Sequence, residues 1–274
     1  MIKLSALQMQ SVPDIKQNLA TIEELLASIN VNGDHIVVLP EACLYFGSKD
    51  KLQLTIAEHL GDGFMQQQLS RLAKQYGVYL VAGSIPIKVA TDEKFTASSL
   101  VYSPQGLLIA DYQKLHLFDV DVDDSEKQYR ESIHTEAGEK TTLVQIEEAL
   151  LGLTICYDLR FPELYRSLAT QGANVITVAS AFTEVTGAAH WLPLLQARAI
   201  ENQVYIIAAN QYGEHLNGRK TFGHSVIINP WGEVEVIKET GKGVITTNFD
   251  LSFTNQVRTN IPVLKHNKFS VTLK

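Results

Sequence analysis

The sequence LLGLTICYDLRFPE, at residues 150–163, decides the fold class because it leads an apolar strand directly to the start of a helix. Short apolar runs such as Leu150–Ile155 are typical of strands buried in a sheet, and we predict a helix over Pro162–Thr170. Cys156 lies between the two, at a strand-to-helix turn. A buried strand followed by a helix is the repeating unit of layered α/β proteins, which is the fold class we expect.

The position of Cys156 suits a nucleophile. A strand-to-helix turn presents its side chain at the carboxyl edge of a sheet, where free N–H groups of the helix start stabilise negative charge on a sulfur or an oxyanion. A buried cysteine acting as a small hydrophobic residue fits the same position. Cys156 alone leaves both interpretations open.

Two further polar side chains follow predicted strands. Glu41 ends the apolar stretch His35–Pro40, and Lys114 lies at the end of a third strand. Because the crevice of an open α/β sheet lies outside the carboxyl ends of its strands, Glu41, Lys114 and Cys156 are expected to meet there. Singly, Glu41 and Lys114 are equally compatible with solvated surface charges. The three strand ends together favour an active site.

Strands and helices alternate along the chain without a repeat, a low-complexity tract or a linker. We therefore expect one α/β domain over residues 1–274. The other predicted strands are Lys3–Met9, Val78–Ile85, Leu100–Tyr102, Leu107–Ala110, Val175–Ala179, Val204–Asn210, Ser225–Asn229 and Glu233–Ile237. The other predicted helices are Asp14–Ile29, Phe64–Tyr76 and Ala188–Asn202.

The segment Lys114–Lys140 departs from this pattern because it is long, acidic and weakly periodic. Structureless segments of this length inside compact domains are usually functional or disordered. We interpret Asp121, Asp123, Asp124 and Glu126 as parts of a solvated acidic loop.

Composition narrows the function classes. With 274 residues, 45% of them hydrophobic, the chain can bury a large core, and no apolar run approaches the ~20 residues of a membrane span. A formal charge of −7 argues against a nucleic-acid surface. The absence of a secretory signal pattern and the two cysteines lead us to expect a cytoplasmic protein. The eight histidines show no ligand spacing, so we expect no metal and no other cofactor.

Three separated segments carry a family resemblance. LPE at 39–41, YQKLHL at 112–117 and GLTICYDLRFPE at 152–163 resemble, in this order, the signature blocks of the nitrilase superfamily of carbon–nitrogen hydrolases. The resemblance extends from LSALQM at 4–9 to NPWGE at 229–233. Within the superfamily, FDVDV at 118–122, YRES at 129–132 and AFTEVTGAAHW at 181–191 are most similar to the Nit amidase branch, whose best-known activity is hydrolysis of deaminated glutathione.

The resemblance implies a four-layer α-β-β-α sandwich. It also implies a homodimer or higher homo-oligomer that packs helices near the nucleophile across a twofold axis, for which Pro162–Thr170 and Ala188–Asn202 are candidates. Within YRES, it identifies Glu131 as a second active-site glutamate that positions Lys114 and the substrate.

Amide hydrolysis requires a nucleophile, a proton for the leaving amine and neutralisation of an oxyanion. Cys156 would supply the nucleophile, and Glu41 would move the proton and activate water. Lys114 and the backbone N–H of Tyr157 would hold the oxyanion. The charge of Lys114 favours a thiolate, whereas burial favours a protonated Glu41, so the proton distribution stays open.

A substrate carboxylate needs a cationic partner. Arg160, four residues beyond the nucleophile, is the first candidate and Arg130 the second. The alternative is that Arg160 pairs with Glu163 or Glu201 and holds helices together.

Several other residues have expected places. Phe182 and Thr183 are expected in or behind the pocket wall, Cys43 as a packed structural thiol, and Arg198 and Glu201 as an i,i+3 ion pair on a helix.

These observations predict a cysteine amidase, free of metal and cofactor, that acts on a small linear carboxylated amide. Deaminated glutathione is the leading substrate, and its cleavage to 2-oxoglutarate and cysteinylglycine would be metabolite repair. The alternatives are an ω-amidase acting on 2-oxoglutaramate or 2-oxosuccinamate, then an N-carbamoyl-amine hydrolase, with nitrile hydrolysis ranked lower. From another class, the chain is compatible with a catalytically silent interaction module.

Overall fold

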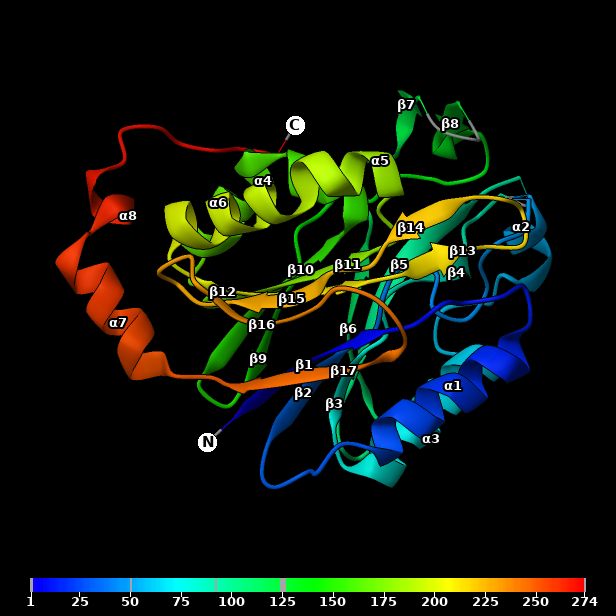
Figure 1. The fold of residues 1–274 in the computed structure, drawn as a ribbon, viewed down its shortest axis with the longest axis horizontal. Helices are drawn as coiled ribbons and strands as arrows, with labels where there is room; N and C mark the ends of the chain where they lie inside the picture. The colour runs from blue at the N-terminus through cyan, green and yellow to red at the C-terminus, as the bar shows by residue number, and fades with distance from the viewer. Residues whose placement is uncertain (1, 50, 92, 124–126, 274) are drawn as a thin grey trace.

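The computed structural model describes residues 2–49, 51–91, 93–123 and 127–273. Two large mixed sheets lie face to face, and helices cover the outer face of each sheet (Figure 1). One apolar cluster joins the two sheets, and a second joins the first sheet to its helices. The predicted four-layer α-β-β-α sandwich is confirmed.

The first sheet contains the strand that leads to Glu41. Strand β2 (His35–Val38) pairs in parallel with β1 (Lys3–Gln8) and with β3 (Tyr79–Val81). The remaining strands are β17 (Gly243–Asn248) beside β1, β5 (Phe95–Tyr102) beside β3, and β4 (Ile85–Lys88) and β6 (Leu108–Gln113), which both pair with β5. Its outer face is covered by α1 (Ile15–Ala27) and α3 (Phe64–Tyr76).

The second sheet contains the strand that leads to Cys156. Its parallel centre consists of β10 (Ala149–Ile155), β11 (Val175–Ser180) and β12 (Tyr205–Asn210), so their carboxyl ends lie at one edge. The flanking strands are β9 (Leu143–Ile146), β15 (Ser225–Ile228) and β16 (Val234–Lys238). The helices α4 (Pro162–Thr170) and α6 (Leu192–Asn202) cover its outer face, and α7 (Leu251–Asn260) and α8 (Val263–His266) follow near the C-terminus. Within the described ranges, no helix has the length and apolar character needed to cross a bilayer.

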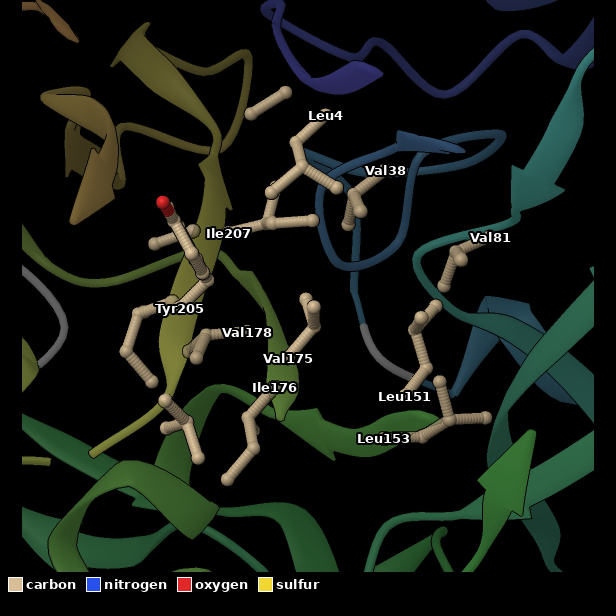
Figure 2. Packing of buried hydrophobic residues seen from close by; sticks show 14 of the residues in the cluster. Leu4, Val38, Val81, Leu151, Leu153, Val175, Ile176, Val178, Tyr205 and Ile207 are labelled. Atoms are coloured by element: carbon tan, nitrogen blue, oxygen red, sulfur yellow. The ribbon is translucent and has the colours of Figure 1, made fainter. Parts of the chain in front are cut away.

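Successive side chains of the strands in the first sheet point to opposite faces, so the apolar residues of these strands divide between two layers. Leu4 and Val38 point between the sheets, whereas Leu7 and Val37 pack in the cluster that contains α1 and α3. Figure 2 shows Leu4, Val38 and Leu151 in the inter-sheet layer. Both faces of β2 are therefore buried, which explains its nearly continuous apolar sequence.

The predicted strand Val78–Ile85 is wrong in its extent, because the chain leaves the sheet after β3 and returns as β4. Gly83 makes this break, with a φ of 55°. It lies so close to the Pro40 carbonyl that a Cβ atom would collide with it. Beyond the break, the Ser84 hydroxyl accepts a 2.8 Å hydrogen bond from the amide of Ala42. The chain at the break therefore packs against Pro40 and holds the amide of Ala42, the two residues on either side of Glu41.

Other expectations hold with local differences. The predicted helix Ala188–Asn202 exists, but a π-helical turn at Gly187–Trp191 joins α5 (Glu184–Thr186) to α6. The predicted strands Leu100–Tyr102 and Leu107–Ala110 correspond to the hairpin β5–β6, and Ser225–Asn229 and Glu233–Ile237 correspond to β15–β16.

The segment Lys114–Lys140 contains more structure than its sequence indicated. Strands β7 (Asp119–Asp121) and β8 (Gln128–Arg130) pair, and the short helix η1 (Glu131–Ile133) follows. Asp124 and Glu126 of the expected acidic loop lie outside the described residues. The remaining short elements are α2 (Leu52–Ile56) and the pair β13 (Tyr212–Glu214) and β14 (Lys220–Phe222).

Candidate active site

Glu41, Lys114, Glu131 and Cys156 line one cavity, called the main cavity below. Glu41 lies beyond β2, Lys114 directly after β6, and Cys156 directly after β10. Lys114 Nζ donates a hydrogen bond of 2.8 Å to Glu41 Oε1 and hydrogen bonds of 3.0 and 2.9 Å to Glu131 Oε1 and Oε2. The structure thus brings Glu131 and the three strand ends together at one point.

Two residues of the site have a left-handed backbone conformation. The φ angle is 48° at Cys156 and 52° at Ala42. Such a conformation costs an L-residue roughly 1–2 kcal/mol. At Cys156 it ends β10 and begins the short helix η2 (Cys156–Arg160), so the thiol lies in the wall of the cavity. Backbone strain of this kind collects at functional sites.

Lys114 is a buried cation, with 1% of its surface exposed. Burial by itself would lower the pKa of the ammonium group. The negative charges of Glu131 and Glu41 outweigh burial and raise the pKa of Lys114 well above its usual value. Lys114 therefore remains protonated, and its charge is shared between two carboxylates.

The environment shifts the pKa values of the two glutamates in opposite directions. Burial favours neutral Glu41, but the charge and hydrogen bond of Lys114 outweigh it and lower the pKa of Glu41. At Glu131 burial prevails, and with the charge of Glu41 it raises the pKa. Glu41 is thus the carboxylate that holds its negative charge more firmly.

The thiol of Cys156 is neutral in this environment. Burial, and next the negative charge of Glu41, raise the pKa of Cys156 above its usual range despite the nearby Lys114. The thiol is also hydrogen-bonded to the Glu41 side chain. A neutral thiol beside an ionised carboxylate can give up its proton to that carboxylate, as a nucleophile does to its general base. The sequence had left open which of Cys156 and Glu41 carries the proton.

Comparison with known proteins identifies the family. Residues 3–259 match the family described as carbon-nitrogen hydrolase. The chain belongs to this family. The deaminated glutathione amidase of Yersinia enterocolitica is 39% identical over 271 residues, which cover 98% of this chain and 94% of the relative. The deaminated glutathione amidase of Synechocystis sp. (strain PCC 6803 / GT-S) is 40% identical over 271 residues and 97% of each chain.

A solved structure supports the same conclusion. Saccharomyces cerevisiae Nit3, a member of branch 10 of the nitrilase superfamily, matches with a TM-score of 0.84 and 30% identity, covering 98% of this chain and 97% of that one. The predicted resemblance to the nitrilase superfamily is confirmed. The protein is a carbon–nitrogen hydrolase that acts on amides.

The other predicted site residues have different surroundings. Tyr157, Phe182 and Thr183 line a smaller hollow beside Cys156, called the side pocket below. Arg130 lines the main cavity, but its guanidinium donates to the carbonyls of Val120 and Tyr129 and to Asp121 Oδ1. Its donors are therefore directed at its own strand pair.

Arg160 lines neither the main cavity nor the side pocket. Its Nη1 lies 3.3 Å from His190 Nδ1, and its guanidinium carbon lies 5.3 Å from the centroid of the Phe182 ring. Among the described residues it forms no ion pair with Glu163 or Glu201. Glu201 pairs with Arg198 at 3.0 Å, as predicted for that i,i+3 pair.

Asp158 is a supporting residue that the sequence did not single out. It is fully buried, and its Oδ2 accepts hydrogen bonds from the Tyr112 hydroxyl at 2.6 Å and the Ile155 amide at 2.9 Å. Its Oδ1 accepts from the His116 amide at 3.1 Å and contacts His116 Nδ1 at 2.7 Å. Burial, and next the charge of Asp158, raise the pKa of Tyr112 well above its usual value, so its hydroxyl remains a donor.

This network connects the chain on both sides of Lys114 with the residue before Cys156. Tyr112 and His116 each lie two positions from Lys114, and Ile155 directly precedes Cys156. One carboxylate thereby fixes the relative position of two strand ends. Its place in the short stretch after Cys156 was visible in the sequence, but its contacts with Tyr112 of β6 and with His116 join it to a distant part of the chain.

We predict that Asp158→Asn lowers the free energy of unfolding by about 1–3 kcal/mol, because the amide directs N–H groups at buried donors. The value of kcat should fall as well, since the strand ends lose their common acceptor. Urea unfolding and steady-state kinetics measure both effects. Glu139→Gln, at an exposed carboxylate outside the helices and strands, is the control and should change stability by less than ~0.5 kcal/mol. Equal stability of Asp158→Asn and the control would contradict the prediction.

Proposed function

We propose that the protein is an amidase that hydrolyses deaminated glutathione to 2-oxoglutarate and cysteinylglycine. The relatives from Yersinia enterocolitica and Synechocystis are named deaminated glutathione amidase and match this chain over nearly its whole length. The observation that supports the proposal most directly is the cluster in which Lys114 Nζ lies 2.8 Å from Glu41 Oε1 in the cavity lined by Cys156.

The first half of the proposed reaction forms a thioester. Glu41 accepts the proton of the Cys156 thiol, and the sulfur attacks the amide carbonyl carbon. The resulting oxyanion is stabilised by the positive charge of Lys114 and by the Tyr157 N–H. The carbon–nitrogen bond then breaks, Glu41 returns the proton to the leaving nitrogen, and cysteinylglycine departs.

The second half hydrolyses the thioester. Glu41 takes a proton from a water molecule, and the hydroxide oxygen attacks the thioester carbonyl. The carbon–sulfur bond breaks, the sulfur regains a proton and 2-oxoglutarate leaves. In this proposal Glu131 positions Lys114, to which it accepts hydrogen bonds through both carboxylate oxygens.

We further propose that the enzyme works in the cytoplasm as a homodimer. Both cysteines are unpaired, which suits a reducing compartment. The outer helices α4 and α6 are the proposed contact, and α6 exposes 53% of Ile200. Light scattering of the purified protein distinguishes a dimer from a monomer, and a monomer would contradict the proposal.

A substrate panel tests the proposed function. Deaminated glutathione, 2-oxoglutaramate, an N-carbamoyl amino acid and a nitrile are compared by release of amine or ammonia. The highest kcat/KM is expected for deaminated glutathione. Faster release of ammonia from 2-oxoglutaramate would identify an ω-amidase instead, and no turnover of any compound would support a silent interaction module.

We predict that Cys156→Ala and Cys156→Ser abolish turnover while leaving the melting temperature nearly unchanged, because each removes the nucleophile with little change of shape. Cys43→Ala is the matched control and should keep most activity. Cys43 does not line the main cavity; its thiol donates to the Ala82 carbonyl at 3.3 Å, and burial raises its pKa to about 12. Inactivation by iodoacetamide with the label on Cys43 alone would overturn the assignment.

We predict that Glu41→Gln lowers kcat by ~10²-fold or more, because the amide keeps the shape but cannot carry the proton. Lys114→Met should raise the activation free energy by roughly 3–4 kcal/mol through loss of an oxyanion partner. Single-turnover kinetics with mass detection of the thioester separates the two half-reactions. Full activity of either variant would remove that residue from the mechanism.

A further inference from the structure

The main cavity offers few free positive charges. Three described residues of its lining are cationic, namely Lys114, Arg130 and Arg219. Lys114 donates three hydrogen bonds to Glu41 and Glu131, which match the three N–H groups of an ammonium. Arg130 donates to two carbonyls and to Asp121. Arg130 thereby uses three of its five N–H groups, whereas Arg219 uses one toward the described residues, so Arg219 has the most uncommitted donors of the three cations.

Arg219 is a fixed cation with unused donors. Its Nη2 donates a 2.9 Å hydrogen bond to the Ala181 carbonyl, while its buried Nε has no hydrogen-bond partner among the described residues. The guanidinium carbon lies 5.0 Å from the ring centroids of both Phe46 and Tyr129. Contacts with two aromatic rings fix the plane of the guanidinium before any ligand arrives.

Arg219 also lies beside the proposed reaction centre. It lines the main cavity and the side pocket, and Cys156 is the other charged or ionisable residue common to both linings. The residue it holds, Ala181, donates its own amide to Glu41 Oε2 at 2.9 Å. A single residue, Ala181, therefore connects the guanidinium with the proposed base through its carbonyl and its amide.

We propose that Arg219 binds the carboxylate on the acyl side of the substrate and thereby selects 2-oxo acid amides. This inference rests on the proposed function, in which the acyl group is 2-oxoglutaryl. That group ends in a carboxylate separated by three carbon atoms from the carbonyl that Cys156 attacks. A planar guanidinium recognises a carboxylate through paired hydrogen bonds. A protein with a formal charge of −7 and two glutamates in the cavity needs such a partner for a dianionic substrate.

Two substrates that differ in one group test the inference. The first is deaminated glutathione, and the second is its analogue N-(4-oxopentanoyl)-cysteinylglycine, in which a methyl group replaces the acyl carboxylate. Arg219→Gln should raise KM for the first by about 10-fold or more, because a hydrogen bond to a charged group is lost. It should change KM for the analogue much less. Arg219→Lys should recover only part of the preference for deaminated glutathione over the analogue, because lysine keeps the positive charge but lacks the paired N–H donors of a guanidinium.

A matched control separates substrate binding from structural support. Arg258 is likewise half-buried and donates to two backbone carbonyls, those of Gln203 and Ala173, from helix α7. Arg258→Gln should leave the ratio of the two KM values unchanged even if it lowers the melting temperature. Equal loss on both substrates in Arg219→Gln would assign Arg219 to structure. Loss of the preference in Arg160→Gln or Arg130→Gln instead would also overturn the inference.

A measurement without turnover distinguishes failure of the inference from failure of the proposed function. Binding of 2-oxoglutarate should slow alkylation of Cys156 by iodoacetamide in the wild type, and Arg219→Gln should abolish this protection. Protection that depends on Arg219 would sustain the carboxylate site even if the panel showed no hydrolysis of deaminated glutathione. Absence of protection in the wild type, or protection independent of Arg219, would refute it.

Discussion

The buried ammonium of Lys114 is the interaction on which the rest of the site depends. A cation with 1% exposure is tolerated only where its lost hydration is replaced by paired charges and hydrogen bonds. Glu41 and Glu131 provide both, and they come from different parts of the chain. Removal of one partner of such a buried group typically costs about 3–5 kcal/mol. Stability and the proposed chemistry thus require the same three side chains in the same place.

The ends of the two sheets hold these three side chains in position through contacts that do not involve the charges of the site. Asp158, which follows the proposed nucleophile, accepts hydrogen bonds from residues on both sides of Lys114. Gly83 lets the chain beyond β3 approach Pro40, so that Ser84 can hold the amide after Glu41. Neither residue has a proposed role in the reaction. Both fix the backbone from which the reacting side chains extend, and this lowers the entropy cost of their alignment.

The sequence predicted those parts of the site that follow from strand ends. Glu41 and Cys156 each terminate an apolar run, and Lys114 follows a third strand. The expectation placed the three ends in the crevice of one sheet, whereas β2 and β6 belong to the first sheet and β10 to the second, so the site lies between the ends of two sheets. Glu131 was found only through the family resemblance, because its segment has no clear periodicity. The break inside Val78–Ile85 was missed because the apolar run continues through it, and only the approach of Gly83 to Pro40 explains why the strand ends.

Arg219 could not be predicted for a related reason. It lies between two short strands, β13 and β14, and reaches the cavity because the amide of Phe222 pairs with the carbonyl of Phe182. That contact joins distant parts of the chain, so no local spacing signals it. Arg160 was the preferred candidate because a position one turn from Cys156 can be inferred from sequence, but its guanidinium lies against His190.

The proposed role of Arg219 also has a consequence for the base. Its positive charge is among the influences that lower the pKa of Glu41, after those of Lys114 and the Cys156 thiol. A substrate carboxylate bound to Arg219 would offset that charge and so raise the basicity of Glu41. The base would then be strongest when an anionic acyl group occupies the cavity, and weaker when the cavity holds water. Substrate selection and activation of the Cys156 thiol would be coupled through one guanidinium, without any movement of the backbone.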